Sequence, residues 1–181
     1  MKVSKEYHYV ILCEDKQMQT FVTHFLRDQD VERHHIRTIP MPGSKGSGEQ
    51  FVRDHLDAEL KELRRRSYNR NALIVLTDAD NLSVEGRIQA LQKEVSEYAI
   101  SKMNDVLLWI PKRHIETWIY YLRDEKNVDE ETRYDHHVML KCKEESKKLS
   151  KMFQDEESEY EYLPSLLRAK EAYQTFCKNQ R

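Results

Sequence analysis

The chain has 181 residues, of which 34% are charged, and it contains only four glycines and four prolines. This length favours a single domain with a hydrophobic core, and the composition favours a helix-rich protein. The formal net charge of -2 excludes a globally cationic nucleic-acid binder, so nucleic-acid contact requires a local basic patch. Three distant cysteines and the lack of a long apolar stretch predict reduced thiols, no membrane contact and a cytoplasmic location.

Strand and helix patterns alternate along the first two thirds of the chain. Apolar and β-branched runs predict strands at 7–13, 36–41, 72–76 and 106–110. Apolar residues at helical spacing predict helices after the first three strands, at 18–26, 51–63 and 84–103. This alternation is typical of βαβ units. It predicts an α/β fold with a mainly parallel sheet of about four strands flanked by helices.

After Pro111 the pattern becomes helical. Apolar and charged residues predict helices at 115–122, 134–153 and 164–179, with an acidic run at 155–161 between the last two. We therefore expect an α/β core over residues 1–122 and a C-terminal helical extension over 123–181, packed together as a single domain.

Acidic side chains follow three of the predicted strands. Glu14 comes after the first strand, Asp78 and Asp80 after the third, and Glu116 shortly after the fourth. In a parallel sheet these strand ends meet at one edge, where ligands bind. Alternation along an extended chain directs Asp78 and Asp80 to the same side. Neighbouring carboxylates repel one another, and Mg²⁺ or Mn²⁺ resolves this repulsion, so the pattern predicts a divalent metal site.

Polar and basic residues are expected at the same edge. The loop 42–48 holds three of the four glycines before a helix, where backbone N–H groups can cradle phosphate, although a merely flexible loop fits equally well. Arg113, after the fourth strand, can bind phosphate through two parallel hydrogen bonds or face solvent. The residues expected to contact nucleic acid are Lys45, Ser47, Gly48, Lys112 and Arg113.

Several of these residues also have ordinary structural explanations. Acids at strand ends are common turn and helix-cap residues, which is the alternative for an isolated Asp-x-Asp. Lysines at 141–151 and arginines at 64–66 are candidates to follow a nucleic-acid backbone, but a solvated face is the commoner explanation. The adjacent histidines 34–35 and 136–137 are expected at the surface with their rings pointing apart. Lys170 or Lys178 is a candidate to reach the acids from the last helix.

The order of these motifs resembles a Toprim domain, the catalytic module of topoisomerases, primases and a group of nucleases. The matching features are a glutamate after the first strand, Thr-Asp-x-Asp ending at Asp80, and Pro-x-Arg-x-Ile-Glu-x-x-Ile starting at Pro111. The last motif is most similar to Toprim nucleases of the overcoming-lysogenization-defect type. The resemblance covers about residues 7–122. It implies a Mg²⁺- or Mn²⁺-dependent phosphoryl-transfer site with the acids Glu14, Asp78, Asp80 and Glu116.

The chain departs from this family at two points. Many Toprim domains have a glycine directly after the first glutamate, where this chain has Asp15. The related nucleases usually carry an ATPase in a longer chain, but this sequence has no Gly-x-x-x-x-Gly-Lys-Ser/Thr motif. The resemblance therefore implies a separate ATPase or another protein subunit as partner, in an anti-phage defence system.

The leading hypothesis is a metal-dependent nuclease that hydrolyses DNA or RNA, with Arg113 stabilising the developing charge. The first alternative is a non-catalytic Toprim-like binding or sensor subunit, which the two departures motivate. The second alternative is a phosphoacceptor signalling domain that uses Glu14, Asp15, Asp78 and Lys112. The additional Asp80 and the helical extension fit this second alternative poorly.

Overall fold

The computed structural model describes residues 2–39, 47–66, 70–95, 100, 103–124, 127–134, 141–155 and 163–180. Its strands are β1 (His8–Cys13), β2 (Ile36–Thr38), β3 (Asn71–Leu76) and β4 (Val106–Trp109). Its helices are α1 (Lys16–Asp28), the 3₁₀ turn η1 (Arg33–His35), α2 (Gly48–Arg65), α3 (Val84–Lys93), α4 (Ile115–Leu122), α5 (Lys143–Gln154) and α6 (Pro164–Asn179).

The strands form one parallel sheet in the order β2-β1-β3-β4. Tyr9 of β1 pairs with Ile36 of β2 on one side and with Ala72 of β3 on the other. The chain therefore leaves β1 in one direction to form β2, and then crosses back over β1 to form β3. The α/β fold with a four-stranded parallel sheet is confirmed, and its topological switch point lies between β1 and β3.

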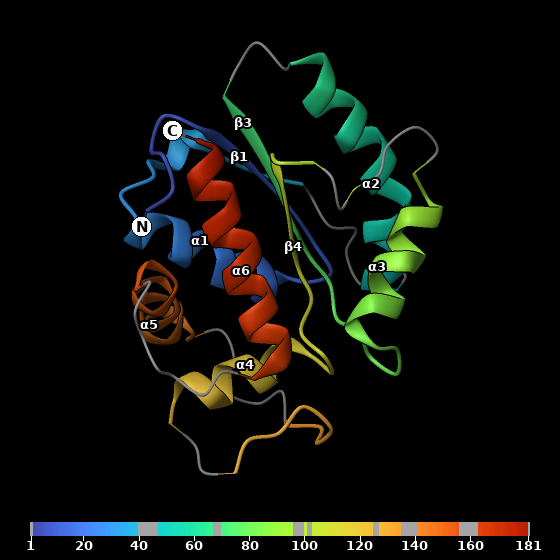
Figure 1. The fold of residues 1–181 in the computed structure, drawn as a ribbon, viewed down its shortest axis with the longest axis vertical. Coiled ribbons are helices and arrows are strands. Elements are labelled where there is room, and N and C mark those ends of the chain that lie inside the picture. Colours follow the sequence, from blue (N-terminus) through green and yellow to red (C-terminus); the bar gives the residue numbers. More distant parts are fainter. Residues whose placement is uncertain are drawn as a thin grey trace.

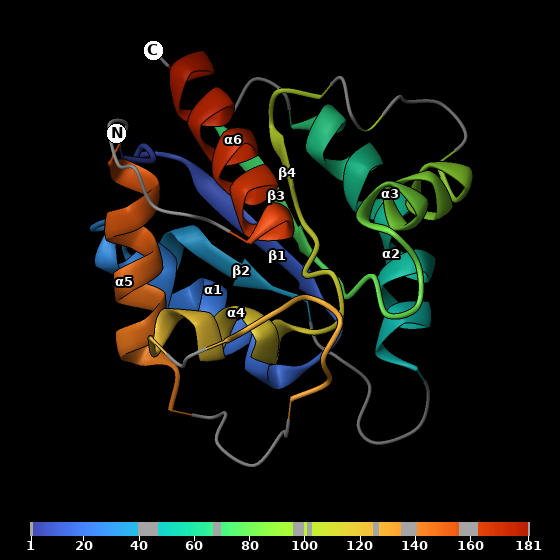
Figure 2. The same ribbon diagram turned by 60° about the horizontal axis from the view of Figure 1, so that its bottom comes forward.

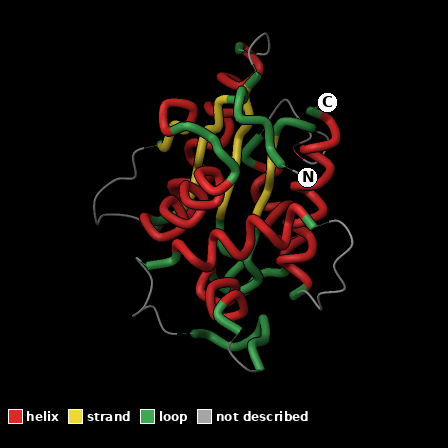
Figure 3. The backbone as a smooth tube through the Cα atoms, turned by 90° about the vertical axis from the view of Figure 1, so that its left-hand side faces the viewer, coloured by secondary structure: helices red, strands yellow, loops and turns green. Residues whose placement is uncertain are grey.

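Helices cover both faces of the sheet. The helices α1, α4, α5 and α6 lie on one face, and α2 and α3 lie on the other (Figures 1 and 2). Figure 3 shows the strands side by side between these helices. Within β1, Ile11 is buried against the first group and Leu12 against the second. Burial on both faces explains why these strands are continuous apolar runs in the sequence.

A cluster of aromatic rings joins the C-terminal helices to the sheet. Phe25 of α1 contacts Trp109 of β4 edge-on, with ring centroids 4.8 Å apart. Phe153 of α5 lies 5.7 Å from Trp109 and 5.4 Å from Tyr173 of α6. The helices α5 and α6 therefore share one hydrophobic core with the strands. The division of the chain at residue 122 stays a prediction.

Two helices are shorter in the structure than the sequence predicted. The helix α3 ends at Lys93 instead of 103, and Gln92 accepts a hydrogen bond from the backbone N–H of Ile100 at 2.8 Å. Val95 is buried without being helical and Ile100 is buried in a 3₁₀ conformation, so apolar spacing alone overestimated this α-helix. Tyr134 lies in a loop rather than in a helix that continues into α5, because its backbone N–H donates to His114 Nε2.

Smaller differences concern strand ends and thiols. The strand β2 ends at Thr38 rather than 41, and most of the acidic run at 155–161 lies outside the described residues. Cys13, Cys142 and Cys177 are buried and form no disulfide, and burial raises the pKa of Cys13 to about 12. Among the described helices, none has the length and apolar character needed to cross a membrane.

The adjacent residues Leu166 and Leu167 of α6 test how this helix packs. Leu166 is fully buried and Leu167 is 41% exposed. We expect Leu166→Ala to lower the free energy of unfolding by about 2–5 kcal/mol, because it leaves a cavity in the core. The matched change Leu167→Ala should alter it by less than about 0.5 kcal/mol. Urea unfolding followed by circular dichroism measures both, and equal losses would contradict this packing of α6.

Candidate functional site

Glu14 links the ends of the two central strands. It directly follows β1, and its Oε1 accepts a hydrogen bond from the backbone N–H of Asp78 at 3.0 Å. The same oxygen accepts a hydrogen bond from the hydroxyl of Thr77, the residue after β3. Glu14 therefore lies at the carboxyl edge of the sheet and at its topological switch point, the place where open α/β sheets bind ligands.

The start of α2 packs directly against Glu14. A Cβ atom placed on Gly48 would lie 2.5 Å from the carbonyl oxygen of Glu14 and 2.8 Å from its Cβ. Only glycine permits this approach without a shift of the backbone. Ser47 caps the helix, since its Oγ accepts a hydrogen bond from the Gln50 N–H at 3.4 Å. The predicted residues Ser47 and Gly48 thus lie beside the acids, whereas Lys45 lies outside the described residues.

Asp78 has a carboxylate oxygen that the protein leaves unsatisfied. The residue is partly exposed, but its Oδ1 is buried and has no hydrogen-bond partner among the described residues. Burial, followed by the negative charges of Glu14 and Glu116, raises the pKa of Asp78 well above its ordinary value. Burial also raises the pKa of Glu14 to about 7, although the hydrogen bonds from Thr77 and Asp78 oppose the shift. The two carboxylates therefore occupy a site that favours added positive charge.

Asp80 has different surroundings from Asp78. Its φ of 54° is left-handed, so the extended geometry that predicted a shared side for the two aspartates does not continue to this residue. Its side chain is 58% exposed and pairs with Arg87 of α3, at 3.1 Å between Oδ2 and Nη2. Arg87 is buried and also pairs with Glu49 of α2. Arg87 therefore ties two helices to the loop that carries Asp80.

A histidine orients Glu116. Nε2 of His114 accepts a hydrogen bond from the backbone N–H of Tyr134 at 3.1 Å, which assigns the proton of the neutral ring to Nδ1. Nδ1 then donates to Oε2 of Glu116 at 2.8 Å. Both side chains are buried. Glu116 is thus fixed within electrostatic range of Asp78, whose pKa it raises.

Lys112 and Arg113 hold the loop that follows β3. Lys112 Nζ donates to the Leu82 carbonyl at 3.1 Å, and Arg113 Nη1 donates to Asn81 Oδ1 at 2.9 Å. Both cations also lie within 4 Å of the exposed carboxylate of Glu131, at 3.8 and 3.9 Å. These two residues therefore lie at the predicted edge, with Arg113 next to the turn at Asp80.

The two lysines considered in the last helix lie elsewhere. Lys178 is near the C-terminal end of α6, where Gln180 accepts a hydrogen bond from the Ser4 N–H at the amino edge of the sheet. The expectation that Lys178 reaches the acids is therefore wrong, because the helix ends at the opposite edge. Lys170 is buried in the middle of α6.

The donor atoms at the carboxyl edge can be compared with the ligands that Mg²⁺ requires. Within the described ranges, no group of three or more His, Cys, Asp or Glu side chains is arranged to hold a metal ion. Mg²⁺ in phosphoryl-transfer sites needs fewer, because one or two carboxylates, several waters and substrate phosphates complete its shell. The buried, unpartnered Oδ1 of Asp78 and the adjacent Glu14 carboxylate are donors of the type required. Asp80 is engaged by Arg87.

Three residues of this site escaped the sequence analysis. Thr77 belongs to the Thr-Asp-x-Asp motif, but its hydrogen bond to Glu14 was not predicted. Arg87 carries no local signal, because its role arises from contacts with Glu49 of α2 and with Asp80. His114 is two residues before Glu116, and the His-x-Glu spacing was the available clue to their pairing.

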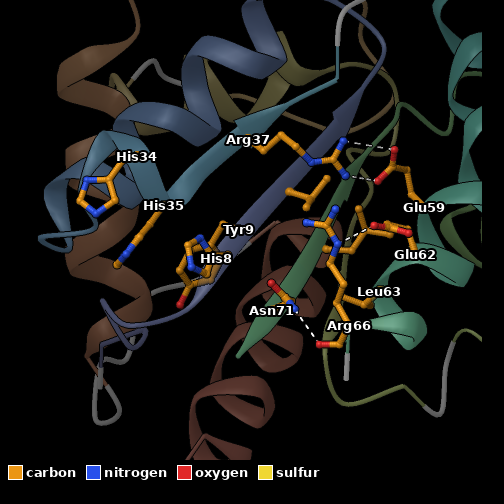
Figure 4. A pocket seen from close by; sticks show the side chains of 12 residues that line it. His8, Tyr9, His34, His35, Arg37, Glu59, Glu62, Leu63, Arg66 and Asn71 are labelled. Carbon is orange, nitrogen blue, oxygen red and sulfur yellow. Dashed lines mark hydrogen bonds and ion pairs between the residues drawn. The ribbon is translucent and has the colours of Figure 1, made fainter. Parts of the chain in front are cut away.

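A cavity lies at the amino edge of the sheet, away from the acids. It measures about 260 Å³ and lies between the first three strands and the end of α2 (Figure 4). The ring of His35 lies 4.6 Å from that of His8 and 4.3 Å from that of His34, so the adjacent histidines do not point apart, because they belong to a 3₁₀ turn. Arg37 and Arg66, which also line the cavity, are each paired with a glutamate of α2. The acids of the carboxyl edge therefore remain the better candidate site.

Comparison of the chain with protein-family models, with curated proteins and with solved structures finds no match. The resemblance to Toprim domains stays a prediction. The functional argument accordingly depends on the geometry of the carboxyl edge.

The glycine at the start of α2 can be tested against a matched glycine in α3. We expect Gly48→Ala to lower the free energy of unfolding by about 1–3 kcal/mol, because its Cβ collides with the backbone of Glu14. In Gly86→Ala the nearest atom to the new Cβ is Ser83 Oγ at 3.2 Å, and the change should stay within about 0.5 kcal/mol. Chemical denaturation measures both, and a neutral Gly48→Ala would contradict the close approach.

The charge of Glu14 should make the metal-free protein less stable as pH rises. Burial raises the pKa of Glu14 from 4.5, its value in the unfolded chain, to about 7 in the folded protein. The free energy of unfolding is therefore highest below about pH 4.5 and falls as pH rises through about 7. Glu14→Gln keeps an acceptor for Thr77 and Asp78 but removes the charge. In EDTA this substitution should raise the free energy of unfolding by on the order of 1–3 kcal/mol at about pH 8 and by little at about pH 5.

Thermal and urea unfolding at the two pH values measure this difference. The control is Glu171→Gln, a change at an exposed position of α6 that should have no comparable effect. A stabilisation by Glu14→Gln that is the same at both pH values would show that charge is not its cause.

Proposed function

We propose that this protein is a metal-dependent nuclease of the Toprim type that hydrolyses phosphodiester bonds in DNA or RNA. The observation that carries the proposal is the buried Oδ1 of Asp78, which has no hydrogen-bond partner among the described residues, beside Glu14 at the switch point of the sheet. Two carboxylates with raised pKa values at this position favour a bound Mg²⁺ or Mn²⁺. When bound, such an ion supplies Lewis-acid chemistry for phosphoryl transfer.

The four acids have distinct parts in this proposal. Asp78 and Glu14 hold the cation from the ends of β3 and β1. Glu116, oriented by His114, adds negative charge behind Asp78. Asp80 stands at the exposed side of the site, where its pairing with Arg87 sets the position of its carboxylate.

Phosphate is oriented by groups on either side of the acids. The first turn of α2, after Ser47 and Gly48, presents backbone N–H groups and the positive end of the helix dipole next to Glu14. Arg113 lies on the other side, beside Asn81, and its guanidinium stabilises charge that develops on the phosphodiester. A separate ATPase or other protein subunit and a role in anti-phage defence belong to the proposal through the Toprim resemblance alone. A cytoplasmic location belongs to it through the expected reduced thiols.

One alternative has an observation in its favour. A non-catalytic Toprim-like binding or sensor subunit agrees with the pairing of Asp80 with Arg87, which leaves fewer carboxylates for a metal. The phosphoacceptor alternative is less favoured, because Asp78 Oδ1 is buried and Lys112 donates to a carbonyl of the neighbouring loop. In that alternative Asp78 would accept the phosphoryl group, so its carboxylate would have to be accessible to a phosphodonor.

The test is cleavage of labelled single-stranded and duplex DNA and RNA with Mg²⁺ or Mn²⁺, compared with EDTA. We expect cleavage that depends on the metal and falls at least about 100-fold in Asp78→Asn and in Glu14→Gln. Glu171→Gln, far along α6 and exposed, should retain full activity. A metal-induced rise in melting temperature that Asp78→Asn abolishes provides a readout independent of turnover.

Two outcomes would remove support for the nuclease. Cleavage that persists unchanged in Asp78→Asn would identify a contaminating enzyme. A metal-induced rise in melting temperature without cleavage of any of the four substrates would favour the binding or sensor subunit.

A further inference from the structure

A groove of about 870 Å³ runs along the exposed side of α1. Its other sides are the start of α5, the turn η1 and the edge strand β2, and both Figures 1 and 2 place α5 beside α1. We call it the basic groove, because five exposed cations line it: Lys16, Arg27, Arg33, Lys143 and Lys147. A single carboxylate, that of Asp28, is among its lining residues.

The cations of the basic groove are not neutralised by the protein. Within the part of the chain that the structure describes, none of the five forms an ion pair with a carboxylate. Elsewhere arginines are paired, such as Arg53 with Glu94, Arg87 with Glu49 and Arg168 with Glu85. In a chain whose net charge is -2, unpaired positive charge is therefore concentrated in this groove and is available to a ligand.

The basic groove opens at the same edge of the sheet as the acids. Lys16 begins α1, directly after its cap Asp15 and two residues after Glu14. Thr38, the last residue of β2, also lines the groove at this edge. From Lys16 to Arg27 the helix rises about 16 Å. That length equals the rise of about five nucleotides stacked as in one strand of B-form DNA.

We propose that the basic groove binds the phosphate backbone of a single-stranded nucleic acid and directs the strand to the acids at the carboxyl edge. Cations on α1 and α5 face a recess between helices, which suits one strand. A duplex is instead entered by a projecting helix or ribbon, which fills a major groove about 12 Å wide. Contacts to phosphate make this binding independent of sequence. Delivery to the acids rests on the proposed nuclease function, whereas strand binding does not.

The experiment measures fluorescence anisotropy of labelled oligothymidylate and oligouridylate of about 16 nucleotides, in EDTA so that no cleavage occurs. The test variant is Arg27→Gln with Lys143→Gln and Lys147→Gln. The control removes three exposed cations that line other surfaces, by Lys5→Gln, Lys93→Gln and Lys178→Gln. Both variants have the same net charge. Melting temperatures of both establish that they are folded.

We expect the groove variant to bind about tenfold or more weakly than the control variant. The slope of log affinity against log salt concentration should fall in magnitude by about 2, because each of the three substituted cations loses one phosphate contact worth about 0.7. Equal binding by the two variants would overturn the groove assignment. A duplex that competes as well as the single strand would overturn the single-strand assignment, and equal competition by polyglutamate would assign the groove to an acidic protein segment.

Failure of this proposal can be separated from failure of the nuclease. Strand binding that the groove variant loses, in a protein that cleaves no substrate, would support the groove and reject the nuclease. Cleavage that depends on Asp78, but is equal in the groove and control variants, would support the nuclease and reject delivery by the groove.

Discussion

Glu14 and Asp78 carry two carboxylates at the ends of adjacent strands, where burial raises the pKa of both. Placing two carboxylates together in a partly buried site is unfavourable, and the Thr77 hydroxyl and the Asp78 N–H offset part of this cost by donating to Glu14. Gly48 packs against the backbone of the same residue. These contacts join β1, β3 and α2 at one point. Much of the carboxyl edge is therefore built to keep negative charge where solvent does not fully screen it.

Among the described residues, the outer acids contact basic side chains, whereas Glu14 accepts hydrogen bonds only from the Thr77 hydroxyl and the Asp78 N–H. Asp80 is matched by the Arg87 guanidinium, and Glu116 accepts a hydrogen bond from His114. Among the described residues, Oδ1 of Asp78 has no comparable contact. An acid with only a structural role is commonly neutralised within the protein, as Glu94 is by Arg53. The cation proposed for this site would neutralise the inner pair in the same way.

The sequence was informative wherever one local rule decided the outcome. Burial on both faces gives continuous apolar strands, and the carboxyl ends of parallel strands bring Glu14 and Asp78 together. Predictions were wrong where a local sequence pattern continued beyond the structural element that it indicates. The alternation of side chains along an extended strand does not reach Asp80, because this residue has a left-handed backbone conformation. Apolar residues at helical spacing continue in the sequence past Lys93, where α3 ends. The pairing of Arg87 depends on how α2 and α3 pack, which no local pattern encodes.

The adjacency of the basic groove and the acids has an electrostatic consequence. A strand that follows α1 past Lys16 brings phosphates towards Glu14 and Asp78, and like charges repel. A divalent cation between carboxylates and phosphate converts this repulsion into attraction. By the reciprocity of linked binding, the strand then raises the affinity for the cation as much as the cation raises the affinity for the strand. If both proposals hold, the basic groove would bind a strand without the cation while the acids repel its phosphates, so that strand binding and engagement at the acids would be separate steps that the metal couples.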